Sequence, residues 1–132
     1  MKILGKVISE PTANLIDSIT SAFCKPVLFS FTSSGDPSYG HCNPFEPDAY
    51  RIFCKESLLN ITKADQPNIP FETNILHELF HICQMEEGFP STFTYAGRDD
   101  GLGSLIVSSI LDIDVDHRLL QFGFDSSYFH SA

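Results

Sequence analysis

The chain is organised around one stretch of sequence, Asn74-Ile75-Leu76-His77-Glu78-Leu79-Phe80-His81-Ile82-Cys83-Gln84. It contains the pattern His77-Glu78-x-x-His81. Residues four apart on an α-helix lie one turn above each other, so both imidazoles would point the same way and could bind one Zn²⁺. Glu78 is rotated about 100° from His77, where it could reach a water on the metal. Because Zn²⁺ lowers the pKa of such a water, we expect Glu78 to act as the general base.

The residues around this pattern indicate an amphipathic helix. At about 100° per residue, Asn74 and Gln84 fall near the two histidines. The opposite arc holds apolar side chains: Phe71, Ile75, Leu76, Leu79, Ile82 and Cys83. Glu72 and Glu86, near the ends, break the pattern. The helix therefore has an apolar face that packs inward and a polar stripe that holds the chemistry, although two surface histidines on such a helix remain the alternative interpretation.

Both ends of this helix are marked in the sequence. Pro70 suits the first turn, where its missing N–H would be unpaired in any case. Gly88 suits the position just past the last turn, and Pro90 prevents continuation.

A catalytic zinc usually has three protein ligands and one open position, so a third ligand is needed. We favour Asp112, about thirty residues after His81, at the expected end of the next helix. The alternative is that Asp112 caps the helix after it. The other candidates are Asp114, Asp116 and His117, and, with less support, Asp99 and Asp100, which resemble a helix cap. Glu86 and Glu87 face away from the two histidines on the wheel and are expected to be solvated.

Composition limits the classes of function. A chain of 132 residues is long enough for one domain, residues 1–132, with a core of its own. The net charge of −9 argues against binding of nucleic acid or of an anionic membrane, both of which require a basic surface. It does not exclude a peptide or protein substrate. No apolar run approaches a membrane span or the core of a signal peptide, so we expect a cytoplasmic protein.

The cysteines are not spaced as a zinc ribbon. Cys24, Cys42, Cys54 and Cys83 form no C-x-x-C pair, and we expect reduced thiols. Cys54 and Cys83 are expected to be small buried side chains. His41-Cys42 is a weak candidate for a metal pair, since no second pair follows at ligand spacing.

The remaining pattern predicts an α+β fold. Residues 11–23 are expected to form an amphipathic helix after Ser9, and residues 27–32 and 50–55 two strands of a short antiparallel or mixed sheet. The segment 33–48 between them is rich in Gly, Pro, Ser and Asn and predicts a long turn region. Two C-terminal helices are expected at 102–111 and 115–122, the second followed by Gly123.

From about Tyr50 to Asp125, the chain resembles the zincin metallopeptidases, in a small minimal form. The strong part is His77-Glu78-Leu79-Phe80-His81, and the weaker part is Ser108-Ser109-Ile110-Leu111-Asp112, which is similar to zincins whose third ligand is aspartate. The resemblance implies that His77, His81 and Asp112 bind Zn²⁺ and that Glu78 is the general base. It also implies that strand 50–55 is the edge strand on which a peptide substrate adds as a further strand.

The chain departs from two zincin subfamilies. Gln84 and Glu87 stand where the metzincin extension has Gly and His, and the second motif of the gluzincins is absent. The subfamily is therefore not assigned. Side chains with the chemistry to stabilise an oxyanion are Tyr95, His117, Tyr128 and His130, and none is singled out by its position.

These observations lead to competing hypotheses of function. The first is zinc-dependent peptide-bond hydrolysis with Glu78 as general base. The second is a catalytically silent zincin-like module that binds metal and holds a protein partner. The third is a metal-free α+β domain. The sequence does not define the oligomeric state.

Overall fold

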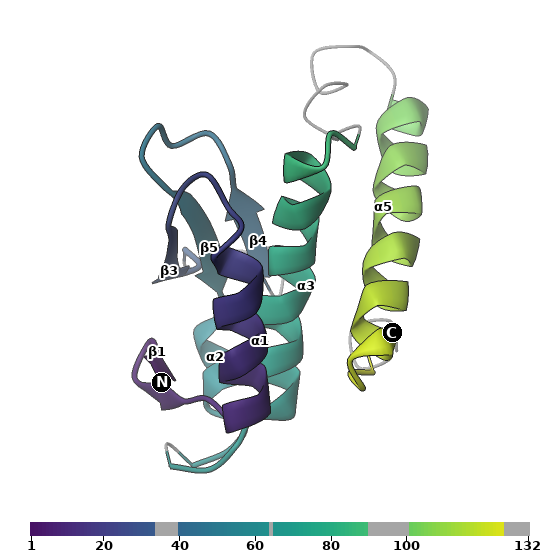
Figure 1. Ribbon diagram of the computed structural model, residues 1–132. Coiled ribbons are helices and arrows are strands. Elements are labelled where there is room, and N and C mark those ends of the chain that lie inside the picture. The colour runs from purple at the N-terminus through teal and green to yellow at the C-terminus, as the bar shows by residue number, and fades with distance from the viewer. Residues whose placement is uncertain (34–39, 64, 90–100, 126–132) are drawn as a thin grey trace.

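The computed structural model describes residues 1–33, 40–63, 65–89 and 101–125. Its elements, in chain order, are β1 (Lys2–Ile3), β2 (Lys6–Val7), α1 (Glu10–Thr20), β3 (Val27–Phe31), β4 (Gly40–Asn43), β5 (Tyr50–Cys54), α2 (Glu56–Leu59), α3 (Ile69–Glu86) and α5 (Gly101–Gln121). Figure 1 shows α3 at the centre, with α1 on one side, α5 on the other and the sheet packed against it. The expectation of a mixed α+β fold is confirmed.

The three-stranded sheet has β5 in the middle. Its order is β3-β5-β4, with β3 parallel and β4 antiparallel to β5. The prediction that strand 50–55 lies at the edge is therefore wrong. The third strand comes from Gly40–Asn43, inside the segment predicted to be turn. Its residues have little strand propensity, but pairing with a buried neighbour overrides such local preference.

The core lies between the sheet and α3. Ile52 of β5 and Ile75, Leu76 and Leu79 of α3 are all fully buried. α3 packs on both β4 and β5, so one face of the sheet is covered by the helix with the His-Glu-x-x-His pattern. The apolar face predicted for this helix is therefore confirmed, and its polar stripe is directed towards β4 and α5.

The ends of α3 follow the expected signals, and one cap was missed. Pro70 lies in the first turn, and Gly88, with φ of +87°, follows the C-cap residue Glu87. Asn68 is the N-cap, and its side chain accepts a hydrogen bond from the Phe71 backbone N–H at 3.0 Å. This bond satisfies one of the donors that every helix leaves unpaired at its start.

Glu72, which breaks the apolar pattern of α3, joins α3 to α1. Its carboxylate is fully buried and accepts hydrogen bonds from the backbone N–H of Ser9 at 3.1 Å and from the Thr12 hydroxyl. α1 spans Glu10–Thr20, somewhat shorter than the 11–23 expected, and Ser9 makes no side-chain cap of its own. Glu72 is therefore a second acidic group at the start of α1, beside Glu10 of the first turn, and the helix dipole favours acidic groups at this end.

The C-terminal part of the described chain is one helix, and the prediction of two helices at 102–111 and 115–122 is wrong. α5 runs without interruption from Gly101 to Gln121. Leu111, Val115 and Leu119 are four residues apart, and all three are buried against α3. The aspartates around residue 113 suggested a cap, but this continuous apolar face outweighs a local preference for capping.

The four cysteines are free thiols. Cys54 is fully buried, as expected, whereas Cys83 is only half-buried, so the expectation for Cys83 is wrong. Across the described ranges, no helix combines the length and the apolar character that crossing a bilayer would require.

Candidate metal centre

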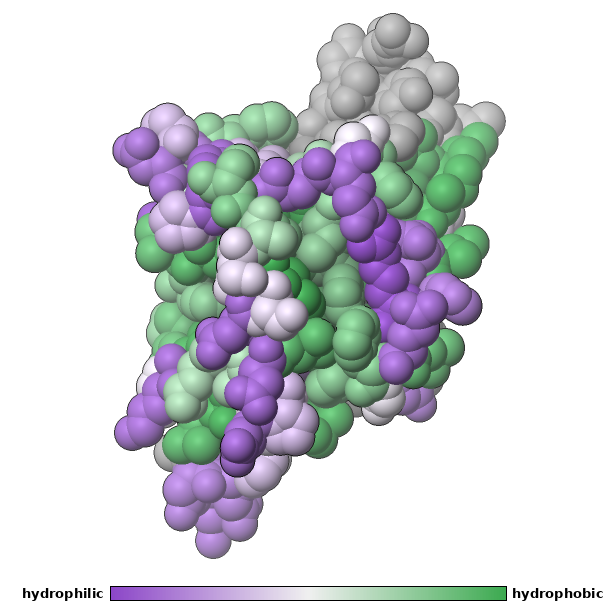
Figure 2. All heavy atoms as spheres, viewed as in Figure 1, coloured by the Kyte–Doolittle hydropathy of each residue, from purple (hydrophilic) through white to green (hydrophobic). Residues whose placement is uncertain are grey.

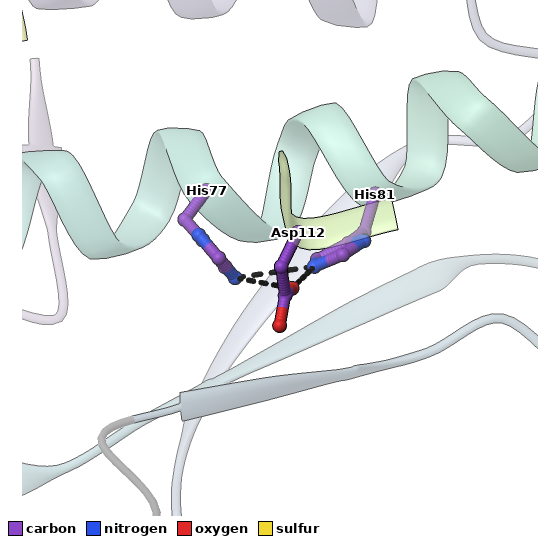
Figure 3. Close-up of side chains that lie close together, drawn as sticks. All are labelled: His77, His81 and Asp112. Atoms are coloured by element: carbon purple, nitrogen blue, oxygen red, sulfur yellow. Dashed lines mark hydrogen bonds and ion pairs between the residues drawn. The ribbon is translucent and has the colours of Figure 1, made fainter. Parts of the chain in front are cut away.

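α3 places the two histidines on one face, one turn apart. The Nε2 atoms of His77 and His81 are 3.1 Å from each other, and the two rings are nearly perpendicular, at 76°. Their side chains are 19% and 20% exposed. Both Nε2 atoms therefore point to one place near the surface (Figure 3).

Asp112 reaches the same place from the middle of α5. Its Oδ1 is 3.0 Å from Nε2 of His81 and 3.6 Å from Nε2 of His77. The Asp112 side chain is 40% exposed, so solvent reaches the cluster from this side. His77, His81 and Asp112 are the group of His, Cys, Asp or Glu side chains in the described residues whose ligand atoms converge within 4.8 Å.

The spacing of these three atoms fits a small divalent cation. Ligands at 2.0–2.1 Å in a tetrahedron around Zn²⁺ lie about 3.3 Å apart. The three separations here, 3.0, 3.1 and 3.6 Å, bracket that distance. Two imidazole nitrogens and one carboxylate oxygen also form a donor set that zinc accepts, with a fourth position left open.

Gln84 sets the tautomer of His81. The Gln84 Nε2 donates hydrogen bonds to the Leu111 carbonyl and to Asp114 Oδ2, both at 2.9 Å. These two acceptors fix the orientation of the amide, so its Oε1 is the atom that lies 2.9 Å from Nδ1 of His81. Nδ1 must then carry a proton, so Nε2 is the nitrogen that offers a lone pair to a metal once the proton that it shares with Asp112 has left.

Glu78 lies buried beside the cluster. Its side chain is on the α3 face covered by β4, and the residue is only 6% exposed. Burial, partly offset by the charge of His81 and a hydrogen bond from the Cys42 thiol, raises the pKa of Glu78 to about 7. A carboxyl group with a pKa near neutrality can both accept and return a proton in neutral solution.

The same contacts act on His81 and Cys42. Burial alone would lower the pKa of His81, but the hydrogen bond to Asp112, the charge of Glu78 and the Gln84 contact together raise it. Burial and the neighbouring Glu78 charge raise the pKa of the Cys42 thiol, so it remains protonated and donates to Glu78. Without metal, His81 and Asp112 therefore share a proton, which a cation must displace to bind.

β4 passes close over the polar stripe of α3. A Cβ atom at Gly40 would lie 2.5 Å from Nδ2 of Asn74 and 2.8 Å from the Phe53 carbonyl oxygen, closer than real contacts allow. Only glycine lets the strand approach α3 this closely. On its other side, β4 pairs with no strand of the described residues.

The other sequence candidates do not join the cluster. Asp114 binds Gln84 and, at 2.8 Å, Nε of Arg118. Asp116 and His117 are further along α5 and do not belong to the three-residue group. Exposed His41 stacks on Phe53 with ring centroids 4.6 Å apart. Several candidates lie outside the described residues: Tyr95, Asp99, Asp100, Tyr128 and His130.

The contacts of Glu86 and Glu87 differ from the expectation of solvated groups. Glu86 accepts hydrogen bonds from the Cys24 backbone N–H and the Tyr50 hydroxyl, and Glu87 pairs with Arg118 at 2.6 Å. Both residues are exposed but have protein partners, and neither is directed at the histidines.

Sequence reasoning missed the roles of Gln84, Cys42 and Gly40. Gln84 falls on the polar stripe of the helical wheel, which was the one available signal for its contact with His81. Cys42 and Gly40 carried no such signal, because their roles depend on β4 pairing with β5.

Comparison of the chain with protein-family models, with curated proteins and with solved structures found no match.

Proposed function

We propose that the protein is a zinc-dependent metallopeptidase of the zincin type, with His77, His81 and Asp112 as metal ligands and Glu78 as general base. The observation that carries the proposal is the convergence of three ligand atoms within 4.8 Å beside a buried glutamate. Zincin-like architecture is part of the proposal, supported by an α+β arrangement in which the motif helix packs under a small sheet. The four free thiols favour a reducing compartment, and we propose the cytoplasm.

Each residue has a distinct role in the proposed reaction. When bound, the metal supplies Lewis-acid chemistry, polarising a carbonyl and acidifying a water. Glu78 accepts the proton of the attacking water and then gives it to the leaving amine, for which a pKa of about 7 is well matched. Cys42 holds the Glu78 carboxylate in place, and Gln84 keeps the lone pair of His81 directed at the cluster.

We propose β4 as the strand on which a peptide substrate adds. β4 lies at the sheet edge and packs on α3, the helix that carries the two histidines. An extended peptide could take backbone hydrogen bonds from this edge and bring a carbonyl towards the metal ligands. The substrate class is therefore a peptide or an unfolded segment of a protein, and the negative chain suits segments of positive charge.

Hydrolysis of a quenched fluorescent peptide library tests the proposal. We expect activity in the zinc-loaded protein, its loss on chelation and its recovery when zinc is restored. Glu78→Gln should lower the rate by about a hundredfold or more while zinc remains bound. His117→Ala, an exposed histidine outside the cluster, is the matched control and should retain activity.

Two outcomes would decide against the proposed mechanism. Full activity in Glu78→Gln would exclude Glu78 as the base. Zinc bound at one equivalent with no hydrolysis of any library would favour the second hypothesis, a zincin-like module that holds a protein partner without cleaving it.

A further inference from the structure

The outward face of α5 carries large apolar side chains that the fold leaves in solvent. Ile106, Ile110, Ile113 and Leu120 are 50%, 61%, 69% and 63% exposed. We refer to these four residues as the outer stripe. Figure 2 shows apolar side chains gathered along the α5 side of the molecule. Single exposed apolar residues are ordinary on protein surfaces, but a continuous row along one helix is not.

The spacing of the outer stripe is that of a helix–helix seam. The intervals are four, three and seven residues, and His117 fills the position that completes the alternation of four and three. This alternation is the a/d pattern by which one helix packs on another. The residues that pack on α3, Leu111, Val115 and Leu119, lie about 180° away, so the outer stripe takes no part in the packing of α5 on α3.

The borders of the outer stripe are acidic. Asp116 borders it on one side and Asp114 on the other. Arg118 is the one Lys or Arg between residues 106 and 121, and it is held by Glu87 at 2.6 Å and by Asp114 at 2.8 Å. A helix that packs on the stripe therefore faces carboxylates on both sides, in a chain whose net charge is −9.

A second copy of the chain fits this surface poorly. Four side chains would bury a few hundred Å² on each partner, whereas stable interfaces bury about 800 Å² per partner. Two copies would also bring two net charges of −9 together and set acidic borders against each other. Opposite charge on the partner is what would compensate for so small an apolar contact.

We propose that the outer stripe docks an amphipathic helix of a partner protein, one whose apolar a/d row is flanked by Lys or Arg. The apolar rows interlock, and the basic flanks face the acidic borders: Asp116 on one side and, on the other, the group of Asp114, Arg118 and Glu87, which holds two carboxylates and one guanidinium. The contact is weak because its buried area is small. It depends on ionic strength because salt screens the charge pairs at its borders. It is independent of the proposed hydrolysis, because the outer stripe lies on a different side of α5 from Asp112.

A synthetic helical peptide with Leu and Ile at positions a and d and Lys at e and g is the probe. Its binding is followed by fluorescence anisotropy, with and without chelator, beside a second peptide with Glu at e and g. The test variant is Ile110→Gln/Ile113→Gln, since Gln keeps helix propensity while removing the apolar surface. Ile69→Gln, at a 54% exposed isoleucine in the first turn of α3, is the matched control.

We expect the Lys-flanked peptide to bind the wild type and Ile69→Gln alike, and more weakly as salt rises. Its affinity for the double variant should be at least about tenfold lower than its affinity for the wild type. The Glu-flanked peptide should likewise bind the wild type at least about tenfold more weakly than the Lys-flanked peptide does. Equal binding of the two peptides, undiminished binding to the double variant, or no binding at all would overturn the proposal. So would a wild-type dimer in light scattering that becomes monomeric in the double variant, because the occupant would then be a second copy.

Discussion

Glu78 is buried, and burial disfavours the charged form of its carboxyl group. The stability of the metal-free protein should therefore depend on pH. In the unfolded chain the carboxyl group of Glu78 titrates near the ordinary glutamate pKa of 4.5, whereas burial raises its folded pKa to about 7. The folded state therefore binds the proton more tightly, and metal-free protein should lose stability as pH rises from about 4.5 to about 7. Below that window the glutamate is neutral in both states and costs little.

We predict that Glu78→Gln stabilises the metal-free protein at pH 8 by about 3 kcal/mol, since one pKa unit corresponds to 1.36 kcal/mol. Urea unfolding in the presence of a chelator, measured at acidic and at mildly alkaline pH, gives the difference. The exposed Glu56→Gln is the control and should leave the pH profile unchanged. A profile for Glu78→Gln parallel to that of the wild type would show that Glu78 is not buried as described.

Gln84 offers a second test at the scale of one residue. Gln84→Leu keeps the volume but removes the acceptor that holds the proton on Nδ1 of His81. We expect zinc affinity to fall by about ten- to a hundredfold, the usual range for loss of such an outer hydrogen bond. Competition with a chromophoric chelator measures it, with the exposed Gln121→Leu on α5 as the control. Unchanged affinity would mean that the tautomer is set without Gln84.

At the scale of elements, α5 is one helix, and its contact with α3 fixes which of its faces is buried. Leu119 is fully buried and its neighbour Leu120 is 63% exposed, so variants of these two residues test directly which face of α5 packs on α3. We predict that Leu119→Ala lowers the free energy of unfolding by about 2–5 kcal/mol, whereas Leu120→Ala changes it by less than about 0.5 kcal/mol. Urea unfolding of both variants checks this, and similar losses would contradict the packing described.

The elements that sequence predicted well are those whose evidence is local. The apolar arc and end signals of α3 are contained in residues 70–88, so its helix and buried face were predictable. β4 was not, because residues 40–43 become a strand only by pairing with β5. The continuity of α5 was missed for a related reason. Val115 and Leu119 stabilise the helix through their burial against α3, and a local sequence pattern does not show this burial.

The same distinction applies to the candidate site. The four-residue spacing of His77 and His81 follows from helix geometry alone. Asp112 was one of several acidic candidates, and its distance from His81 depends on how α5 crosses α3. Gln84, which contacts His81 and α5 together, was visible only as a polar residue on the right stripe. A single sequence does not determine side-chain contacts that depend on how two elements pack against each other.

At the scale of the whole molecule, a metal measurement must distinguish binding at the three-residue site from nonspecific attraction of cations to the negatively charged chain. A chain of net charge −9 attracts divalent cations without a specific site. Such binding is weak and screened by salt, whereas a three-ligand site holds its ion through dialysis at physiological ionic strength. Variants that change one ligand but hardly alter the total charge distinguish the two.

The central claim is that three side chains from α3 and α5 hold one metal ion, and zinc stoichiometry after dialysis tests it most directly. We predict about one equivalent in the wild type and in the control His117→Ala, and less than about a tenth of an equivalent in His77→Ala, His81→Ala and Asp112→Ala. Circular dichroism and thermal unfolding establish that each variant is folded. Equal zinc in the wild type and in folded His77→Ala would contradict the account.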